Sequence, residues 1–435
     1  MIKYNEFDKA PGSVNLPAEP DFQTTIGREE TTMNFKQIST AVLASALLAG
    51  VAHAEIANNR IRIGVLSDLS GIYEQNSGNG SVEAVKMAVE EFGGKINGAT
   101  VEVLAGDHQN KPDVGASVAN RWFDVEGVDM ITDLVNSAVA FAVVDAAKAK
   151  NKTVFVTSGG SADLTGKACA PDNSVHWVYD TYQMGKSMGL AVPQLGKKWF
   201  FITADYAFGI ALEGALSNAV KAMGATVVGS VKAPLGTADF SSFVLQAQAS
   251  GADVLAINNG GDDAINAAKA AREFGLQAKG VKVVALGLDS LPAIKSASLD
   301  VAQGGMYVTT WLPEISPEAQ AFTKKFIERR KTAPSSFQVG TYSAALNWLK
   351  AVQATNSKDP KVVLAYMQKQ NFKDSFTNGG TLRPDGRMVH DVYLVQVKTP
   401  AESKSEWDLL KIVATIKGED AFRPLADGGC AALKK

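Results

Sequence analysis

The sequence predicts an α/β fold built from two similar, Rossmann-like lobes. Two observations predict it. Short apolar segments alternate with segments of helical periodicity, and this alternation runs along the chain twice in similar order. Short buried strands separated by helices are typical of a parallel sheet that is covered on both faces. The length of 435 residues also leaves room for two or three domains.

The first round of alternation follows residue 60. Its predicted strands cover residues 60–67, 100–105, 130–134 and 153–157, and its predicted helices cover residues 81–92, 113–125 and 137–150. The second round repeats this order. Its predicted strands cover residues 198–203, 226–231, 254–258 and 281–285, and its predicted helices cover residues 208–223, 240–249 and 262–274. Long helices at 317–329 and 337–354 and a last strand at 389–397 complete the expected elements.

The pattern changes near residues 176–182 and again near residues 306–311, and no low-complexity linker separates the rounds. We therefore expect two hinged lobes rather than independently tethered domains. The expected N-terminal lobe covers residues 55–180 plus 308–375. The expected C-terminal lobe covers residues 181–307 plus 376–435, which include the tail.

Residues 33–54 have the form of a secretory signal peptide. Lys36 supplies a positive charge, residues 41–51 are apolar, and Ala52-His53-Ala54 has the A-x-A cleavage form. The apolar run is shorter than the roughly 20 residues that span a bilayer. We expect cleavage after Ala54 and export to the periplasm. Residues 1–32 are polar and aperiodic, so we expect a non-native or disordered extension, with Met33 as the true start.

The composition excludes one class of partner. The chain is 46% hydrophobic and 20% charged, and its formal net charge is −2. A protein without an excess of basic residues is poorly suited to neutralise phosphates, so we expect no nucleic-acid partner. Cys169 and Cys430 are the two cysteines of the chain. In an oxidising compartment such a pair favours a disulfide over two free thiols.

Ligands of open parallel sheets bind beyond the carboxyl ends of the strands, so the strand-to-helix loops are informative. Gly159-Gly160-Ser161-Ala162-Asp163 resembles the nucleophile elbow G-x-S-x-G but lacks the last glycine, which disfavours a hydrolase. Residues 78–83 (GNGSVE) have two of the three glycines of a dinucleotide site, and the loop before them is too long. Metal-binding spacings and the Walker A motif are absent from the sequence. We expect no catalytic residue, cofactor or metal.

Two loops on neighbouring strands favour a carboxylate site. Asn136 and Ser137 precede one predicted helix, and the small residues 157–162 (TSGGSA) end the strand before another turn. Free N–H groups at such helix starts, together with hydroxyls, can hold an anion. Plain helix capping is the alternative for Asn136 and Ser137. Tyr73, Tyr206 and Phe208 also follow strands, where they either enclose an apolar ligand body or pack within their own lobe.

Four segments, together with the repeated lobe order, resemble a known family: residues 61–73 (IRIGVLSDLSGIY), 80–94, 157–169 (TSGGSADLTGKAC) and 200–209 (FFITADYAFG). The chain resembles the type I periplasmic substrate-binding proteins of ABC transporters, of the leucine/isoleucine/valine-binding-protein-like group. The resemblance covers essentially all of the chain after residue 54.

The resemblance implies a Venus-flytrap with three hinge crossings, a monomer that closes on its ligand and docks on a membrane ABC permease. It implies that the ligand carboxylate is held by the loop with Asn136 and Ser137 and by the loop with Gly160 and Ser161. We also expect Ser158, in the second of these loops, to bind ligand. An aromatic side chain of the second lobe corresponds to Phe208, with Tyr206 nearby and Tyr73 in the first loop. An acidic residue that would receive a ligand amine falls near Asp289, and the resemblance supports the bridge between Cys169 and Cys430.

We therefore expect a non-enzymatic receptor for a branched-chain amino acid or for an aromatic or aliphatic acid. A periplasmic sensor with the same fold is the alternative, followed by a secreted hydrolase.

Overall fold

A computed structural model describes residues 60–434 of this protein. The expected extension, the signal peptide and the cleavage site after Ala54 lie outside these residues. Within them, none of the helices combines the length and the apolar character needed to cross a membrane. The same residues contain no group of three or more His, Cys, Asp or Glu side chains that could hold a metal ion.

The N-terminal lobe is built on a six-stranded sheet in the order β2-β3-β1-β4-β5-β6. The neighbours of β1 run parallel to it, and the short β2 pairs antiparallel with β3. Its strands are β1 (Arg60–Ser67), β2 (Lys95–Ile96), β3 (Ala99–Asp107), β4 (Met130–Asp133), β5 (Thr153–Val156) and β6 (Ser174–His176). Its helices are α2 (Gly78–Phe92), α3 (Pro112–Asp124), α4 (Ser137–Ala149), α13 (Ser336–Thr355) and α14 (Pro360–Met367).

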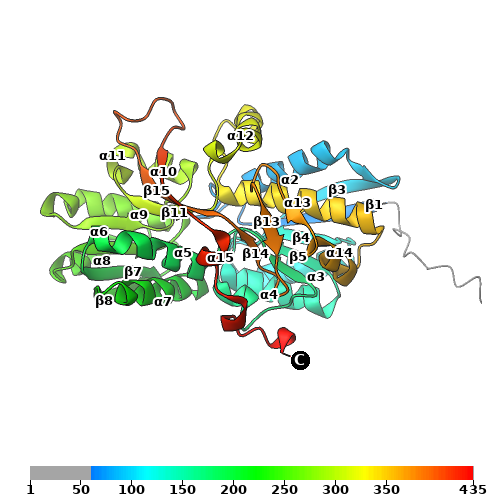
Figure 1. The fold of residues 1–435 in the computed structure, drawn as a ribbon, viewed down its shortest axis with the longest axis horizontal. Helices are drawn as coiled ribbons and strands as arrows, with labels where there is room; N and C mark the ends of the chain where they lie inside the picture. The colour runs from blue at the N-terminus through cyan, green and yellow to red at the C-terminus, as the bar shows by residue number, and fades with distance from the viewer. Residues whose placement is uncertain (1–59, 435) are drawn as a thin grey trace, which may run out of the picture. The chain divides into compact units, whose positions relative to one another are not determined.

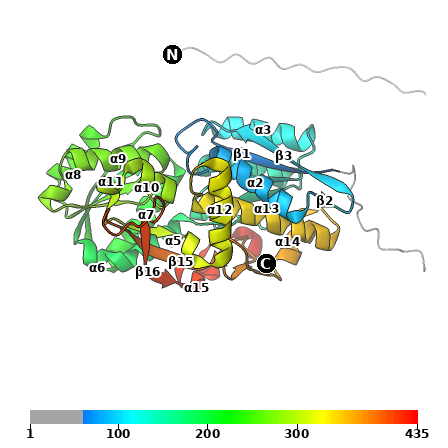
Figure 2. The same ribbon diagram turned by 90° about the horizontal axis from the view of Figure 1, so that it is seen from above.

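The C-terminal lobe is built on a four-stranded parallel sheet in the order β10-β9-β7-β8. Its strands are β7 (Lys198–Ala204), β8 (Thr226–Ala233), β9 (Val254–Asn258) and β10 (Lys282–Ala285). Its helices are α5 (Thr181–Met188), α6 (Val192–Leu195), α7 (Ala207–Ala222), α8 (Ser241–Ala249), α9 (Gly261–Glu273), α10 (Leu291–Ala297) and α11 (Leu299–Ala302). Figures 1 and 2 show the two sheets with helices on both of their faces.

The two sheets share one topology. The first strand of each lobe lies between the second and the third, since β1 lies between β3 and β4 just as β7 lies between β8 and β9. The predicted α/β fold with two similar lobes is thus confirmed. In both lobes the strand order reverses beside this first strand, and such a reversal opens a crevice at the carboxyl ends of the strands.

The lobes are joined by three crossings. The first runs from β6 into α5, and the second from β11 (Met306–Thr309) towards α12 (Pro317–Arg330) and α13. The third lies between β14 (Met388–His390) and β15 (Val392–Val397). Two small antiparallel sheets accompany them, β11-β15-β16 and β12-β13-β14. Their remaining strands are β12 (Asn371–Phe372), β13 (Gly380–Leu382) and β16 (Leu410–Ile416).

One expected element differs from the structure. The last strand, predicted as one unit over residues 389–397, is interrupted at Asp391. β14 pairs with β13, whereas β15 pairs with β11 and β16. The alternating apolar pattern continues across Asp391, so the hydropathy does not reveal that the pairing partner changes. The helices α5, α10 and α14 and the strand β16 are among the elements without a counterpart in the expected set.

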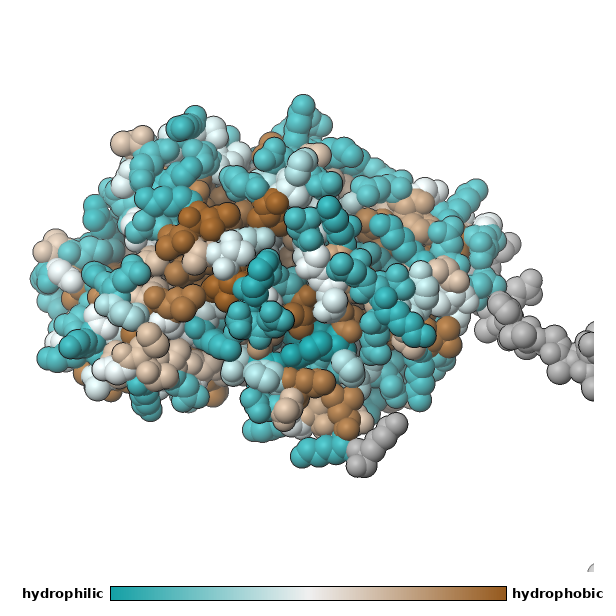
Figure 3. All heavy atoms as spheres, in the orientation of Figure 1, coloured by the Kyte–Doolittle hydropathy of each residue, from teal (hydrophilic) through white to brown (hydrophobic). Residues whose placement is uncertain are grey.

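Large aromatic side chains fill the core around the crossings. Trp177, Trp199 and Trp348 are fully buried. Trp177 packs edge-on against Phe155 and Phe372, with ring centroids 5.6 and 4.9 Å apart. This packing fixes the first crossing against the N-terminal sheet. On the outer face drawn in Figure 3, hydrophilic residues predominate and apolar residues gather over part of the C-terminal lobe.

The predicted disulfide is confirmed. Cys169 and Cys430 are bonded, and their Cα atoms lie 5.5 Å apart. Cys169 precedes β6, whereas Cys430 lies in the chain after α15 (Gly418–Ala421). The bond therefore ties the end of the chain to the N-terminal lobe.

Candidate ligand-binding site

A small cavity lies between the two lobes at the carboxyl ends of the strands. Its volume is about 20 Å³, which is little more than the roughly 10–15 Å³ that one water molecule needs. Residues of both lobes line it: Tyr73, Asn76, Val135, Tyr179, Met184, Tyr206, Phe208, Gly260, Gly261, Leu286, Gly287, Asp289 and Phe337. A solute larger than water requires these walls to move apart.

Aromatic rings make up much of the cavity wall. The Tyr179 ring stacks on Phe337 with the centroids 4.8 Å apart and meets Phe208 at 6.5 Å. Tyr206 lies 6.1 Å from Phe208 in a tilted pair. Phe337 is placed by the capping box at the start of α13, in which the side chains of Ser335 and Gln338 bond each other's backbone N–H. Such rings suit an apolar or aromatic ligand body.

The first loop, residues 68–77 after β1, bridges to the C-terminal lobe. The hydroxyls of Tyr73 and Tyr206 lie 2.6 Å apart. The N–H of Asp262 donates to the carbonyl of Ile72 at 3.0 Å. Burial, and then the neighbouring Tyr206, raises the pKa of Tyr73 well above its ordinary value, so its hydroxyl stays protonated. These contacts hold the cavity closed on one side.

Gly261 allows this close approach. Its φ of +58° is left-handed, and a Cβ there would collide with the carbonyl oxygen of Ile72. Glycine adopts this conformation without a steric penalty. Farther along the first loop, Asn76 accepts a hydrogen bond from the Ser290 hydroxyl at 3.0 Å. Gln75 Nε2 donates to the Ser296 hydroxyl at 2.5 Å.

Asp289 brings a carboxyl group into the cavity wall after β10. Its side chain is 6% exposed, and burial raises its pKa to about 7. Among the described residues, the cavity lining includes no Lys, Arg or His. An uncompensated buried carboxylate is unfavourable, so Asp289 can accept a hydrogen bond from a ligand donor or pair with a ligand cation.

The two loops expected to hold a carboxylate lie side by side behind the cavity wall. The N–H of Ser161 donates to the Ser137 hydroxyl at 3.1 Å. Asn136 caps α4 by accepting from the N–H of Ala138 at 2.9 Å, as in the capping alternative. All four of these residues lie outside the cavity lining, and Val135 lines it in their place.

Gly160 and Ser158 support the wall through Tyr179. A Cβ on Gly160 would come within 2.7 Å of the Tyr179 ring, so the ring lies directly on this glycine. The Tyr179 hydroxyl donates to the Ser158 carbonyl at 2.9 Å. Of the residues expected to bind ligand, the structure thus places Tyr73, Tyr206, Phe208 and Asp289 in the cavity wall. It places Asn136, Ser137, Ser158, Gly160 and Ser161 directly behind it.

A buried carboxylate beside this site was not among the residues expected from the sequence. Asp133 ends β4 and is fully buried. The Ser77 hydroxyl lies 2.5 and 2.6 Å from its two carboxylate oxygens. Burial raises the pKa of Asp133, and hydrogen bonds from serine hydroxyls, Ser158 first among them, oppose the rise. The sequence signal that could have indicated this buried carboxylate is an acidic residue at the end of an apolar strand.

The backbone at this point is left-handed over two residues. Asp133 has φ +86° and Leu134 has φ +62°. Positive φ is uncommon for residues other than glycine, although Asp and Asn tolerate it best. The turn carries the chain from β4 to Val135 in the cavity wall. Tyr179, Met184 and Phe337 were also missed, because they come from the crossings and helices rather than from the strand-end loops.

Known proteins are similar to this chain in sequence and in fold. A family model described as periplasmic binding protein matches residues 60–404. The chain belongs to the periplasmic binding protein family. The predicted resemblance to the leucine/isoleucine/valine-binding-protein-like group of ABC-transporter binding proteins is confirmed.

This periplasmic binding protein has solved relatives. It is similar to a periplasmic binding protein from Burkholderia mallei, with 42% identity, a TM-score of 0.83 and coverage of 86% of this chain and 100% of that chain. It is similar to a branched chain amino acid ABC transporter periplasmic ligand-binding protein from Burkholderia xenovorans, with 41% identity, a TM-score of 0.75 and coverage of 86% and 99%. It is also 26% identical to the Leu/Ile/Val-binding protein homolog 6 of Brucella melitensis over 332 residues, which cover 73% of this chain and 81% of the relative.

Proposed function

We propose that this periplasmic binding protein is a non-enzymatic solute receptor that delivers a small carboxylate-bearing ligand to a membrane ABC permease. The observation that carries the proposal is the cavity between the lobes, whose walls come from strand-end loops of both lobes and from the crossings and helices beside them. A ligand held there contacts both lobes, so binding favours the closed arrangement over an open one. The permease then distinguishes the closed receptor from the open one.

The walls support an apolar ligand body. The rings of Tyr179, Phe208 and Phe337 offer faces and edges to a branched aliphatic or aromatic group. Residues 136–137 and 158–161 are the proposed carboxylate side, because α4 starts there and the backbone N–H of Ser161 is satisfied only by a hydroxyl. A ligand carboxylate is a stronger acceptor than the Ser137 hydroxyl and can replace it as the partner of this N–H.

Asp289 is the proposed partner of a ligand amine. With a pKa of about 7 the carboxyl group is poised between its two forms at neutral pH. An ammonium group nearby favours the ionised form. A ligand without an amine would instead meet the protonated carboxyl group. Asp289 would thereby discriminate between ligands with an amine, such as amino acids, and carboxylic acids without one.

We further propose that the protein acts as a monomer in the periplasm, after removal of residues 33–54 by cleavage behind Ala54. The family to which the chain belongs supports this location, and the export pattern of residues 33–54 supports it independently. Residues 1–32 are then absent from the mature protein.

Calorimetric titration of residues 55–435 with three matched compounds tests the proposal. Leucine carries the amine and the carboxylate, 4-methylpentanoate lacks the amine, and 3-methylbutylamine lacks the carboxylate. Benzoate extends the series to aromatic acids. We expect at least one of the carboxylates to bind and 3-methylbutylamine not to bind. Binding of the amine alone would refute the carboxylate requirement, and binding of none would refute the ligand class.

The variant Asp289→Asn separates the two carboxylate classes. If leucine is the ligand, the substitution should weaken leucine about tenfold or more, because a charge-assisted hydrogen bond is lost. If 4-methylpentanoate or benzoate is the ligand, its affinity should change little. Weakening of a simple acid by this variant would contradict the proposed role of Asp289 as an amine acceptor.

A further inference from the structure

The C-terminal tail, residues 418–434, returns to the loop that the proposed function assigns to ligand binding. We propose that Arg423 in this tail is a positioning residue for the rim loop, residues 157–166, and that the disulfide between Cys169 and Cys430 keeps it in place. Ligand affinity then depends on the redox state of the disulfide. This inference rests on the proposed function, because it takes the rim loop as part of the ligand site.

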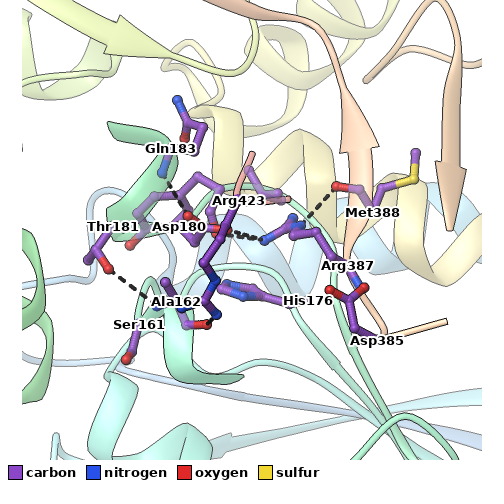
Figure 4. A network of polar contacts seen from close by, with 12 residues as sticks. Ser161, Ala162, His176, Asp180, Thr181, Gln183, Asp385, Arg387, Met388 and Arg423 are labelled. Atoms are coloured by element: carbon purple, nitrogen blue, oxygen red, sulfur yellow. Dashed lines mark hydrogen bonds and ion pairs between the residues drawn. The ribbon is translucent and has the colours of Figure 1, made fainter. Parts of the chain in front are cut away.

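Arg423 contacts the rim loop directly. Its Nη2 donates to the carbonyl of Ala162 at 2.8 Å. The tail also lies against Gly166, where a Cβ would collide with Arg423 Nη2 and come within 2.9 Å of the Gly428 carbonyl oxygen. Arg423 itself is fixed, because Arg383 Nη1 donates to its carbonyl at 2.7 Å. Figure 4 shows the Arg423 side chain extending to Ala162.

Hydrogen bonds within the rim loop connect Ala162 to the residues proposed to bind the ligand carboxylate. The N–H of Ala162 donates to the Thr181 hydroxyl at 3.2 Å, and the N–H of Thr181 donates to the Gly160 carbonyl at 2.8 Å. The neighbouring N–H of Ser161 meets Ser137 at 3.1 Å. Residues 160–162 are therefore held between the start of α5 and the tail. Loss of the Arg423 contact removes one side of this support.

A second contact joins the tail to the cavity wall. Phe422 is 1% exposed, and its ring lies 4.6 Å from the guanidinium carbon of Arg387. Arg387 Nη1 donates to the carbonyl of Tyr179 at 3.1 Å and pairs with Asp180 at 3.5 Å. Tyr179 lines the cavity. The tail thus supports both Tyr179 and the rim loop.

The disulfide is the covalent anchor of the tail. Between β16 and residue 434, the described chain forms the four residues of α15 and two short 3-10 helices, and it pairs with no strand. The bond joins residues 261 positions apart. A dithiol reductant breaks this S–S bond, leaves two protein thiols and is itself oxidised to a disulfide. The freed tail is then held only by the contacts of Phe422, Arg423 and their neighbours.

The test combines four variants of the mature chain with two measurements. Arg423→Met removes the donor and keeps most of the side chain's length, whereas Arg423→Lys retains a donor. Arg121→Met is the matched control, because Arg121 of α3 forms an exposed ion pair at 2.8 Å with Glu126, which follows the helix. A double variant, Cys169→Ser with Cys430→Ser, lacks the disulfide. Kd is measured with the tightest binder among leucine, 4-methylpentanoate and benzoate, and hydrogen exchange is followed at amides 158–166.

We expect Arg423→Met to raise Kd about tenfold, as for the loss of one charge-assisted hydrogen bond, and to speed exchange at amides 158–166. Arg423→Lys should recover most of the affinity, and Arg121→Met should match the wild type. Dithiothreitol should raise the Kd of the wild type several-fold and leave that of the double variant unchanged.

Unchanged exchange at amides 158–166 in Arg423→Met would overturn the inference, whatever the ligand. Faster exchange with unchanged Kd would overturn it as well, since the loop would then move without affecting binding. If Arg423→Met does not fold, the same two quantities are measured on the wild type with and without dithiothreitol. Unchanged exchange at amides 158–166, or an unchanged Kd, would then overturn the inference. Failure of the wild type to bind any of the three compounds is a failure of the proposed function, and hydrogen exchange still tests the positioning role separately.

Discussion

Tyr73 of the N-terminal lobe and Tyr206 of the C-terminal lobe share a hydrogen bond of 2.6 Å between their hydroxyl groups. The two residues are 133 positions apart, and both line the cavity between the lobes. The bond exists only while the lobes are together, so its contribution belongs to the closed arrangement. Four predictions concern this closed site.

Tyr73→Phe keeps the ring and removes the hydroxyl bond between the lobes. We expect the ligand to dissociate faster and Kd to rise about three- to tenfold, because one hydrogen bond contributes about 0.5–1.5 kcal/mol net. Stopped-flow dissociation measures the effect. Tyr182→Phe on the partly exposed surface of α5 is the control and should leave the rate unchanged. Equal rates in Tyr73→Phe and the wild type would show that the bond does not contribute to closure.

Gly261→Ala should hinder closure through a collision with the carbonyl oxygen of Ile72. Gly236 is the matched control, since it also has a positive φ, +81°, but a Cβ there would meet nothing within 4 Å. Both variants carry the cost of left-handed alanine, about 1–2 kcal/mol. We expect a rise in Kd of more than tenfold only in Gly261→Ala, measured by calorimetry. A similar Kd in the two variants would contradict the contact between Gly261 and the first loop.

Asp133→Ala should destabilise the fold more than Asp133→Asn. Alanine leaves the buried Ser77 hydroxyl without its acceptor and disfavours the φ of +86°. The expected loss is about 3 kcal/mol in the free energy of unfolding, from an unsatisfied hydroxyl and a left-handed alanine together. Asparagine keeps an acceptor oxygen and tolerates positive φ, so its loss should be about 1 kcal/mol. Urea denaturation measures both. Equal losses would mean that the Ser77 bond is not formed.

Asp289 makes stability depend on pH. Burial raises its pKa from 3.8 to about 7, so the folded protein holds this proton at pH values where the unfolded chain has released it. The unfolded state therefore binds fewer protons between about pH 4 and pH 7, and the free energy of unfolding falls as the pH rises through this window. At about 1.36 kcal/mol per unit the effect reaches at most about 4 kcal/mol.

Asp289→Asn removes this contribution. The difference in unfolding free energy between pH 5 and pH 8 should be smaller in the variant than in the wild type. Asp263, whose pKa burial raises to about 6, contributes in the same direction and remains in both proteins. Denaturant unfolding at the two pH values measures the difference. An identical pH dependence would show that the Asp289 carboxyl group is not buried in the closed site.

The sequence was sufficient for the lobes and for part of the cavity wall. Tyr73, Tyr206, Phe208 and Asp289 follow strands, and the strand-end rule places them at the sheet edges that face each other. The rule does not predict Phe337, because this residue lies at the start of α13, which follows the second crossing and not a strand of either parallel sheet. It does not predict Tyr179 either, whose position depends on the first crossing and on Arg387 just before β14, 208 residues away.

Helix capping explains why the carboxylate loops were harder to predict. From the sequence, Asn136 and Ser137 are equally compatible with helix capping and with ligand binding. In the structure Asn136 caps α4, and the Ser137 hydroxyl accepts a hydrogen bond from the N–H of Ser161. The outcome depends on the left-handed turn at Asp133 and Leu134, which turns Val135 towards the cavity. A buried aspartate that is satisfied by distant serines leaves no local signal for such a turn.

Small-angle X-ray scattering of residues 55–435, with and without the tightest binder of the leucine, 4-methylpentanoate and benzoate series, tests closure on a ligand most directly. We predict that saturation with ligand reduces the radius of gyration and brings the scattering curve to the one calculated for the closed structure with Tyr73 against Tyr206. The Gly261→Ala variant should retain the larger radius at the same ligand concentration. A wild-type curve that does not change on saturation would contradict the proposal that the lobes close on the ligand.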